Sequence, residues 1–221
     1  MLPSLRRYTT FSSPDVAEFL WAIGIGVAAA VVGTGIRRLA LVLRPIVVPR
    51  RVMLTPVVGL VVAGSAIAYG EATGKSSSQV LFSGQDALAP LIQNAAGYTV
   101  GAIVLLFVCK SLAYGVSLSS FRGGPIFPAV FVGAAGGIAL SHLPGLPLIA
   151  GVGMGIGAMT VAMLRLPLTA VLLPTLVLQA DSLNLMPLVI VAVVVSYVVV
   201  ARLTPVAPAE PAPAPATTPP N

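Results

Sequence analysis

The sequence predicts an all-α integral membrane protein with broken and re-entrant helices. Its 221 residues are 57% hydrophobic and only 8% charged, whereas soluble domains have about 25% charged residues. No residue between Arg122 and Arg165 carries a formal charge. That stretch is too long for one span of about 20 residues and too broken by glycine and proline for one straight helix. Short helices whose ends meet inside the membrane, as in transporters that bind ions, would account for it.

The first apolar element is preceded by a polar N-terminal segment, residues 1–16. Residues 19–36 carry no charge and are long enough to span a membrane. Their glycines favour close helix packing. Five arginines follow, and we expect them to cluster in a loop that the positive-inside rule places in the cytoplasm: Arg37, Arg38, Arg44, Arg50 and Arg51. A lipid-binding patch is the alternative interpretation of this cluster.

Two further uncharged runs follow. Residues 52–70 form a second candidate span, and residues 71–86 are polar and predict a loop, with Asp86 in the first turn of the next helix. The third run, residues 87–109, contains Pro90 and a nearby asparagine. We therefore expect a short separate helix before a true span near residues 96–116.

Lys110 lies between two apolar runs. Its ammonium group either snorkels to the membrane surface or faces a polar interior, where it would raise the local concentration of an anion. Both interpretations stay open at this stage. The single cysteine, Cys109, excludes an intramolecular disulfide and a cysteine metal cluster.

The segment after Arg122 is typical of a tight turn between membrane helices, and its residues also allow an anion site. Gly123 and Gly124 allow the backbone to approach a ligand closely, while Pro125 and Pro128 suit the start of a helix. The apolar run AVFVGAAGGIAL that follows is a good helix, and its start would aim free N–H groups and the positive end of its dipole at the loop. Such an end binds anions without a formal charge. A tight turn between two membrane helices is the alternative.

The remaining elements complete the expected fold. His142 lies between two short helices, either as a surface loop residue or as a proton carrier. We expect Arg165, just before Leu166 and Pro167, to cap the carbonyls at a helix C-terminus, with a direct anion contact as the alternative. Residues 167–179 form a short apolar helix and residues 183–201 the last span. The tail, residues 203–221, is Pro/Ala-rich and predicted to be disordered.

Several function classes lose support. The chain has no nucleophile elbow, no zinc-protease motif and no P-loop lysine. We therefore do not expect an enzyme, a catalytic residue, a metal site or a cofactor. Its acidic residues lie at the edges of apolar runs or in tails, which argues against a cation-coupled transporter. The net charge of +6 reflects basic loop ends rather than nucleic-acid binding.

Two sequence blocks resemble a known family. The run from Gly123 to Pro128, followed by AVFVGAAGG, resembles the signature that precedes one helix of CLC chloride channels and chloride/proton antiporters. The run from Gly153 to Thr169, which ends in R-L-P-L-T, resembles a later block in the same order and at similar spacing. The resemblance implies that residues 17–202 are the second half of a CLC-type inverted-repeat transmembrane domain.

The resemblance also implies site residues. In the family, backbone amides just after the Gly-Gly pair hold a dehydrated chloride ion. Pro125 has no N–H, so Ile126 and Phe127 would supply the amides, beside Gly124. The family has a basic residue and a serine-rich approach at positions matched here by Lys110, Ser117, Ser119 and Ser120, and we treat Lys110, Ser119 and Ser120 as possible pathway residues.

Some family features have no match in this chain. The G-S-G-x-P and G-x-E-x-P loops of the first half are not found, and the last tyrosine, Tyr197, lies inside the last span. The expected function is chloride transport across a cell inner or plasma membrane by a truncated CLC chain, as channel or antiporter. A homodimer is implied, and a separate first-half chain is a possible partner. The alternatives are a non-conducting structural membrane fragment and an unrelated transporter with broken helices.

Overall fold

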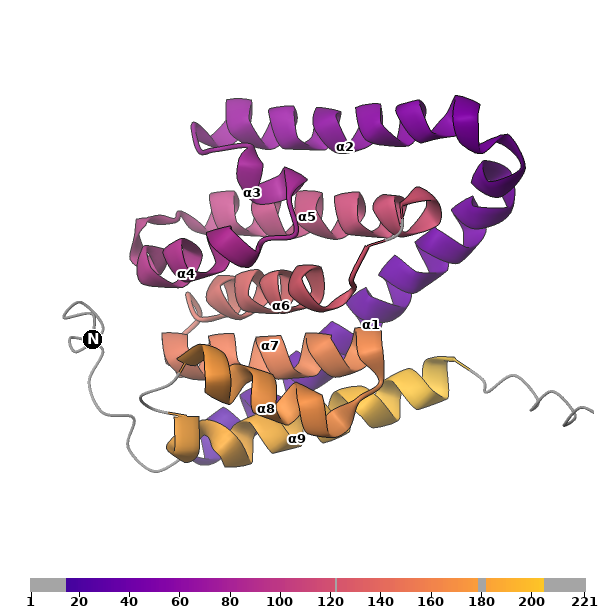
Figure 1. Ribbon diagram of the computed structural model, residues 1–221. Helices are drawn as coiled ribbons and strands as arrows, with labels where there is room; N and C mark the ends of the chain where they lie inside the picture. The colour runs from indigo at the N-terminus through magenta and orange to yellow at the C-terminus, as the bar shows by residue number, and fades with distance from the viewer. Residues whose placement is uncertain (1–14, 122, 179–181, 205–221) are drawn as a thin grey trace, which may run out of the picture.

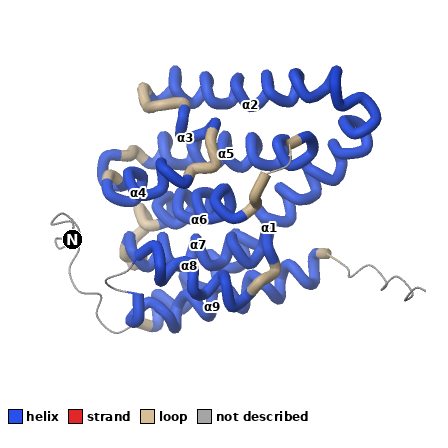
Figure 2. The backbone as a smooth tube through the Cα atoms, viewed as in Figure 1, coloured by secondary structure: helices blue, strands red, loops and turns tan. Residues whose placement is uncertain are grey.

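The computed structural model describes residues 15–121, 123–178 and 182–204. Residues 1–14 of the polar segment, residues 179–181, Arg122 and residues 205–221 of the tail predicted to be disordered lie outside the described residues. Helices make up the regular structure of the described part, with no strand there (Figures 1 and 2). The long helices run back and forth in a flat stack, and α1 crosses it obliquely (Figure 1).

The first two helices show that the predicted arginine loop is wrong. Helix α1 (Val16–Val47) continues through Arg37, Arg38 and Arg44, and only the 3₁₀ turn η2 (Val48–Arg50) separates it from α2 (Arg51–Thr73). Arginine is a good helix former, and its charge lies at the end of a long side chain, so charge alone did not mark a helix end. Asp15 caps α1 together with Glu18 in a capping box.

The predicted polar loop before the third run is only partly correct. Helix α2 extends to Thr73 and ends at Gly74, which has a left-handed φ of 65°. Two short helices follow, α3 (Ser78–Leu81) and α4 (Gln85–Gln93), and Asp86 lies in the first turn of α4 as predicted. After a 3₁₀ turn, η3 (Ala95–Gly97), the long helix α5 (Val100–Ser120) confirms a short helix followed by a true span.

The uncharged central stretch is broken into two short helices, as predicted. Helices α6 (Ile126–Leu140) and α7 (Leu148–Leu164) have 15 and 17 residues and pack directly against each other. An ideal Cβ on Gly133 would lie 2.4 Å from the carbonyl oxygen of Gly155. One on Gly137 would lie 2.2 Å from that of Gly151. Glycine is therefore required at this antiparallel contact, because any side chain would separate the two backbones.

Helices α8 (Pro167–Leu178) and α9 (Ser182–Leu203) complete the bundle, and α9 packs along α1 and α7. In the part of the chain that the structure describes, three apolar helical segments are long enough to cross a membrane: Val16–Thr73, Val100–Ser120 and Asn184–Leu203. Apolar side chains cover much of their outer surface, for example on Leu60, Val104 and Val194. A membrane protein exposes such side chains because its surroundings are apolar lipid.

Candidate anion site at the start of α6

The N-terminus of α6 presents two backbone amides without a partner among the described residues. Pro125 is the N-cap and makes no side-chain capping bond. The first helical hydrogen bond runs from the Ala129 amide to the Pro125 carbonyl, at 3.4 Å. Pro128 has no N–H. The amides of Ile126 and Phe127 therefore remain as the donors of the first turn, at the positive end of the helix dipole.

The surroundings of this helix end are open. The side chains of Ile126 and Phe127 are 38% and 44% exposed. Gly124 is exposed, and a Cβ placed on it would meet no heavy atom within 4 Å. The residues around this helix end are therefore accessible from outside the described part of the bundle.

Helix α5 fixes the position of this end. The hydroxyl of Tyr114 donates a hydrogen bond of 2.9 Å to the Pro125 carbonyl. The ring of Tyr114 packs in a buried cluster with Ala129, Ile36 and Met159. Helices α1, α5, α6 and α7 thus meet at one junction beside the start of α6. The Tyr114 contact could not be predicted from the sequence, because it depends on how α5 and α6 pack.

Lys110 does not snorkel, since only 2% of its surface is exposed. Its ammonium donates to the carbonyls of Gln79 and Val80, at 2.9 and 3.1 Å, and to that of Phe82. It also lies 4.9 Å from the centre of the Phe131 ring. Three acceptors match the three donors of an ammonium group. Lys110 therefore holds the C-terminal end of α3 against the core, and its role in an anion pathway stays a prediction.

The two pathway serines also have local partners. The Ser119 hydroxyl is buried and donates to the Val116 carbonyl at 2.7 Å. The Ser120 hydroxyl lies 3.3 Å from that of Thr55 on α2. Both serines belong to the last turn of α5, which leads into the start of α6. Their contact with a transported anion stays a prediction.

His142 and Arg165 occupy opposite ends of α6 and α7. His142 is exposed in the turn between the two helices, with Nδ1 3.0 Å from the Ile138 carbonyl, as expected of a loop histidine. Arg165 ends α7 with a left-handed φ of 58°, and its backbone amide bonds the Val161 carbonyl. Its side chain does not cap the helix, because Nε and Nη2 are buried and have no hydrogen-bond partner.

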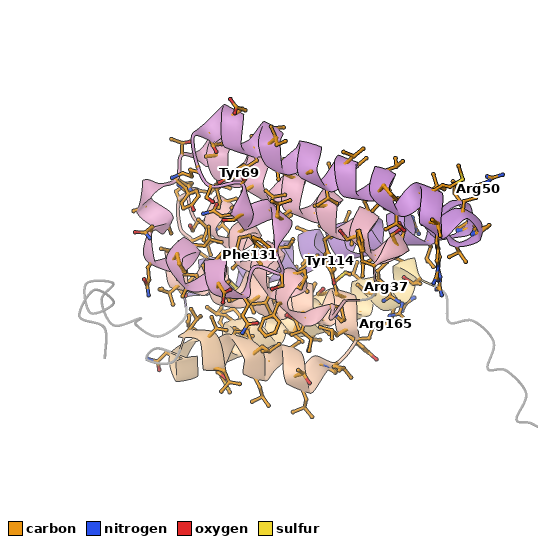
Figure 3. The ribbon with its side chains drawn as sticks, turned by 45° about the horizontal axis from the view of Figure 1, so that its top comes forward. Arg37, Arg50, Tyr69, Tyr114, Phe131 and Arg165 are labelled. Carbon is orange, nitrogen blue, oxygen red and sulfur yellow. The ribbon has the colours of Figure 1, made fainter. Side chains whose placement is uncertain are left out.

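Arg37 on α1 is a second arginine with an unpartnered buried nitrogen, Nη1. It lies close enough to Arg165 to be repelled by its charge. Figure 3 shows Arg37, Tyr114 and Arg165 in one region of the molecule. Sequence reasoning missed this pair, because Arg37 was expected in a loop and the two arginines are far apart in the chain.

Comparison with known proteins identifies the family of this chain. The sequence model for the voltage gated chloride channel family matches residues 3–201. The chain belongs to the voltage gated chloride channel family. This result confirms the resemblance seen in the two glycine-rich blocks, and the all-helical membrane fold agrees with it. The chain is an integral, multi-pass membrane protein of a family of ion channels and transporters.

Curated relatives match a shorter region. The "Putative ion-transport protein YfeO" of Escherichia coli (strain K12 / DH10B) is 45% identical over 69 residues, and the protein of the same name in Shigella boydii serotype 18 gives the same values. The match covers 30% of this chain but only 16% of each relative. No solved structure matches this chain.

Proposed function

We propose that this chain takes part in chloride transport across a membrane as a CLC-type channel or antiporter, and that the amides of Ile126 and Phe127 hold the ion. The observation that carries this proposal is the uncapped start of α6. Two prolines, Pro125 and Pro128, flank two first-turn amides that have no partner among the described residues. In the family, amides after the matching Gly-Gly pair hold a dehydrated chloride, which supports this assignment.

The physical basis is binding by dipoles. An anion at this end exchanges water for two N–H groups and the positive end of a 15-residue helix. Binding by partial charges is weak enough for the ion to leave again, as conduction requires. Gly124 contributes space rather than a side chain, so a hydrated ion can shed water close to the backbone.

The charge distribution favours approach of an anion from the same side. The C-terminal ends of α1, α7 and α9 and the start of α2 lie at one end of the stack, together with the start of α6 (Figure 1). The arginines in these segments are Arg37, Arg38, Arg44, Arg50, Arg51, Arg165 and Arg202. The acids Asp15 and Glu18 begin α1 and Glu71 lies near the end of α2, at the opposite end. A basic end raises the local anion concentration by electrostatic attraction.

Chloride efflux from liposomes tests the proposed transport. The purified chain is reconstituted alone, and in parallel with a separately expressed first half of a related CLC protein. We expect chloride release above that of protein-free liposomes in at least one of these preparations. If neither preparation releases chloride, the chain is the non-conducting structural fragment that the sequence also allowed. The family assignment has already removed the third interpretation, an unrelated transporter.

The proposed assembly is a homodimer, in which each chain works with a first half supplied by a partner chain or by further sequence. The family resemblance supports the dimer. Cross-linking in native membranes measures directly whether the chain forms a dimer. A chain that stays monomeric in its own membrane would remove the dimer from the proposal and leave the α6 site in place. Proton coupling is open, since a gating glutamate is not found in this chain.

A further inference from the structure

Two arginines in the region of the start of α6 (Figure 3) have three buried guanidinium nitrogens that lack a hydrogen-bond partner among the described residues. They are Nη1 of Arg37 and both Nε and Nη2 of Arg165. Arginine cannot be deprotonated in a protein, so both side chains stay charged. Both residues are half-buried as a whole, and their nitrogens that are shielded from water without a hydrogen bond are unfavourable. Two such charges that repel each other add to this unfavourable energy.

The chain itself supplies no counter-charge at this place within the described residues. The nearest acids along α1, Asp15 and Glu18, lie at its start, while Arg37 lies in its C-terminal half. Tyr114 is close to Arg37, but its hydroxyl already donates to the Pro125 carbonyl. By contrast, the neighbouring Arg38 is satisfied, because its Nη2 donates to the Leu203 carbonyl at 3.1 Å. Among the arginines that the structure describes, Arg37 and Arg165 are the two with buried nitrogens that lack a partner.

The packing holds the two side chains together. A Cβ placed on Gly33 would lie 2.7 Å from the Cβ of Ala162, so α1 and α7 are in close contact one turn before Arg37 and just before Arg165. Ile36, next to Arg37, packs in the same cluster as Met159 of α7. Because rigid helices carry both arginines, the pair cannot separate freely to relieve its repulsion.

The two free donors of Arg165 have the geometry that binds an oxyanion. Nε and Nη2 lie on one edge of a guanidinium, and this edge binds two oxygens of a phosphate or carboxylate in parallel. Nη1 of Arg37 adds a third donor. A carboxylate offers two oxygens and one charge, whereas a phosphate group offers more oxygens and up to two charges. The phosphate group therefore fits three donors on two cations better.

We propose that Arg37 and Arg165 form a phosphate-binding site beside the start of α6, distinct from the chloride site at the two amides. The ligand is a phosphate group, either as free inorganic phosphate or as the headgroup of an anionic lipid. The site lies at the basic end of the helix stack, and basic pockets between membrane helices bind lipid headgroups. Its existence does not rest on chloride transport.

Calorimetric titration of the full chain in an uncharged detergent tests this site. Sodium phosphate is added at constant chloride concentration and ionic strength. We expect wild type to bind phosphate, and Arg165→Gln and Arg37→Gln each to bind at least tenfold more weakly. Arg165→Lys keeps the charge but lacks the two-donor edge, so we expect it to bind more weakly than wild type as well. The matched control is Arg44→Gln, which removes an exposed arginine from the same helix.

A second arm identifies the source of the phosphate group. A short-chain phosphatidic acid is titrated in place of inorganic phosphate, with the matching diacylglycerol as control. Binding of either phosphate ligand that Arg37→Gln and Arg165→Gln abolish and Arg44→Gln preserves supports the site, and the tighter ligand names the source. Absence of binding to wild type in both arms, or equal weakening by Arg44→Gln, overturns it. Circular dichroism of each variant shows whether it is folded. If one of the two arginine variants does not fold, the other still tests the site.

Discussion

At the scale of single residues, a buried cation is satisfied in this protein by backbone carbonyls rather than by an acid. The ammonium of Lys110 has three carbonyl acceptors near the end of α3. These carbonyls would otherwise lack partners at a helix terminus inside an apolar bundle. From the sequence, a lysine between two apolar runs predicted either snorkelling or a polar pathway, and the structure shows a third arrangement. Only the packing of α3 on α5 reveals it.

Replacing this lysine tests its structural role. We expect Lys110→Met to destabilise the fold by about 3 kcal/mol, because it leaves buried carbonyls unpaired. Lys75→Met is the matched control. Its ammonium makes one exposed bond to the Gly97 carbonyl and lies over the Tyr98 ring, so its loss changes stability by less than about 1 kcal/mol. Unfolding in mixed detergent micelles measures both. Equal effects of the two changes would argue against a special role for Lys110.

At the scale of elements, the contact between α6 and α7 depends on four glycines in two G-x-x-x-G patterns, Gly133 with Gly137 and Gly151 with Gly155. Sequence analysis correctly predicted two short helices here, because glycine and proline interrupt an uncharged stretch too long for one span. It could not predict which glycines face each other, since that depends on the crossing of the helices. Sequence analysis failed at the arginines after residue 36. Their charge was interpreted as the sign of a loop, whereas α1 continues through this region.

An alanine at this contact tests its importance. We expect Gly137→Ala to destabilise the fold by about 1–3 kcal/mol, because its Cβ would meet the Gly151 carbonyl and push the helices apart. Gly59→Ala on α2 is the control, since its Cβ would meet no atom within 4 Å. Alanine is the better helix former, so this control is neutral or stabilising by up to about 1 kcal/mol. The same micelle unfolding assay compares them, and a neutral Gly137→Ala would contradict the described contact.

At the scale of the whole molecule, the charges divide between the two ends of the helix stack. The basic end contains the η2 turn, and the opposite end contains the turn between α6 and α7 (Figure 1). From the positive-inside rule we therefore expect the start of α6 on the cytoplasmic side. The sequence predicted a cytoplasmic position for the arginine cluster only, and those arginines lie mostly on a helix rather than in a loop. Charge near the end of a span directs insertion whether or not the chain is helical there.

Cysteine labelling with a membrane-impermeant reagent measures this topology. Arg50→Cys lies in the exposed η2 turn, and Leu143→Cys lies in the exposed turn between α6 and α7. In intact cells we expect Leu143→Cys to react and Arg50→Cys to stay protected until the membrane is opened. The native Cys109 is buried and gives the background. The reverse pattern of labelling would contradict the assigned orientation.

The most direct test of the account is chloride binding by the two free amides of α6. Isothermal titration with chloride compares Phe127→Pro and Ile126→Pro, which each remove one N–H, with Phe127→Ala and Ile126→Ala, which keep it. Proline is tolerated in the first turn of a helix, so circular dichroism should show all four variants folded. The account predicts about tenfold weaker chloride binding for each proline variant, because one hydrogen bond to a charged ligand is lost, and near wild-type binding for each alanine variant. Unchanged binding by both proline variants would contradict it.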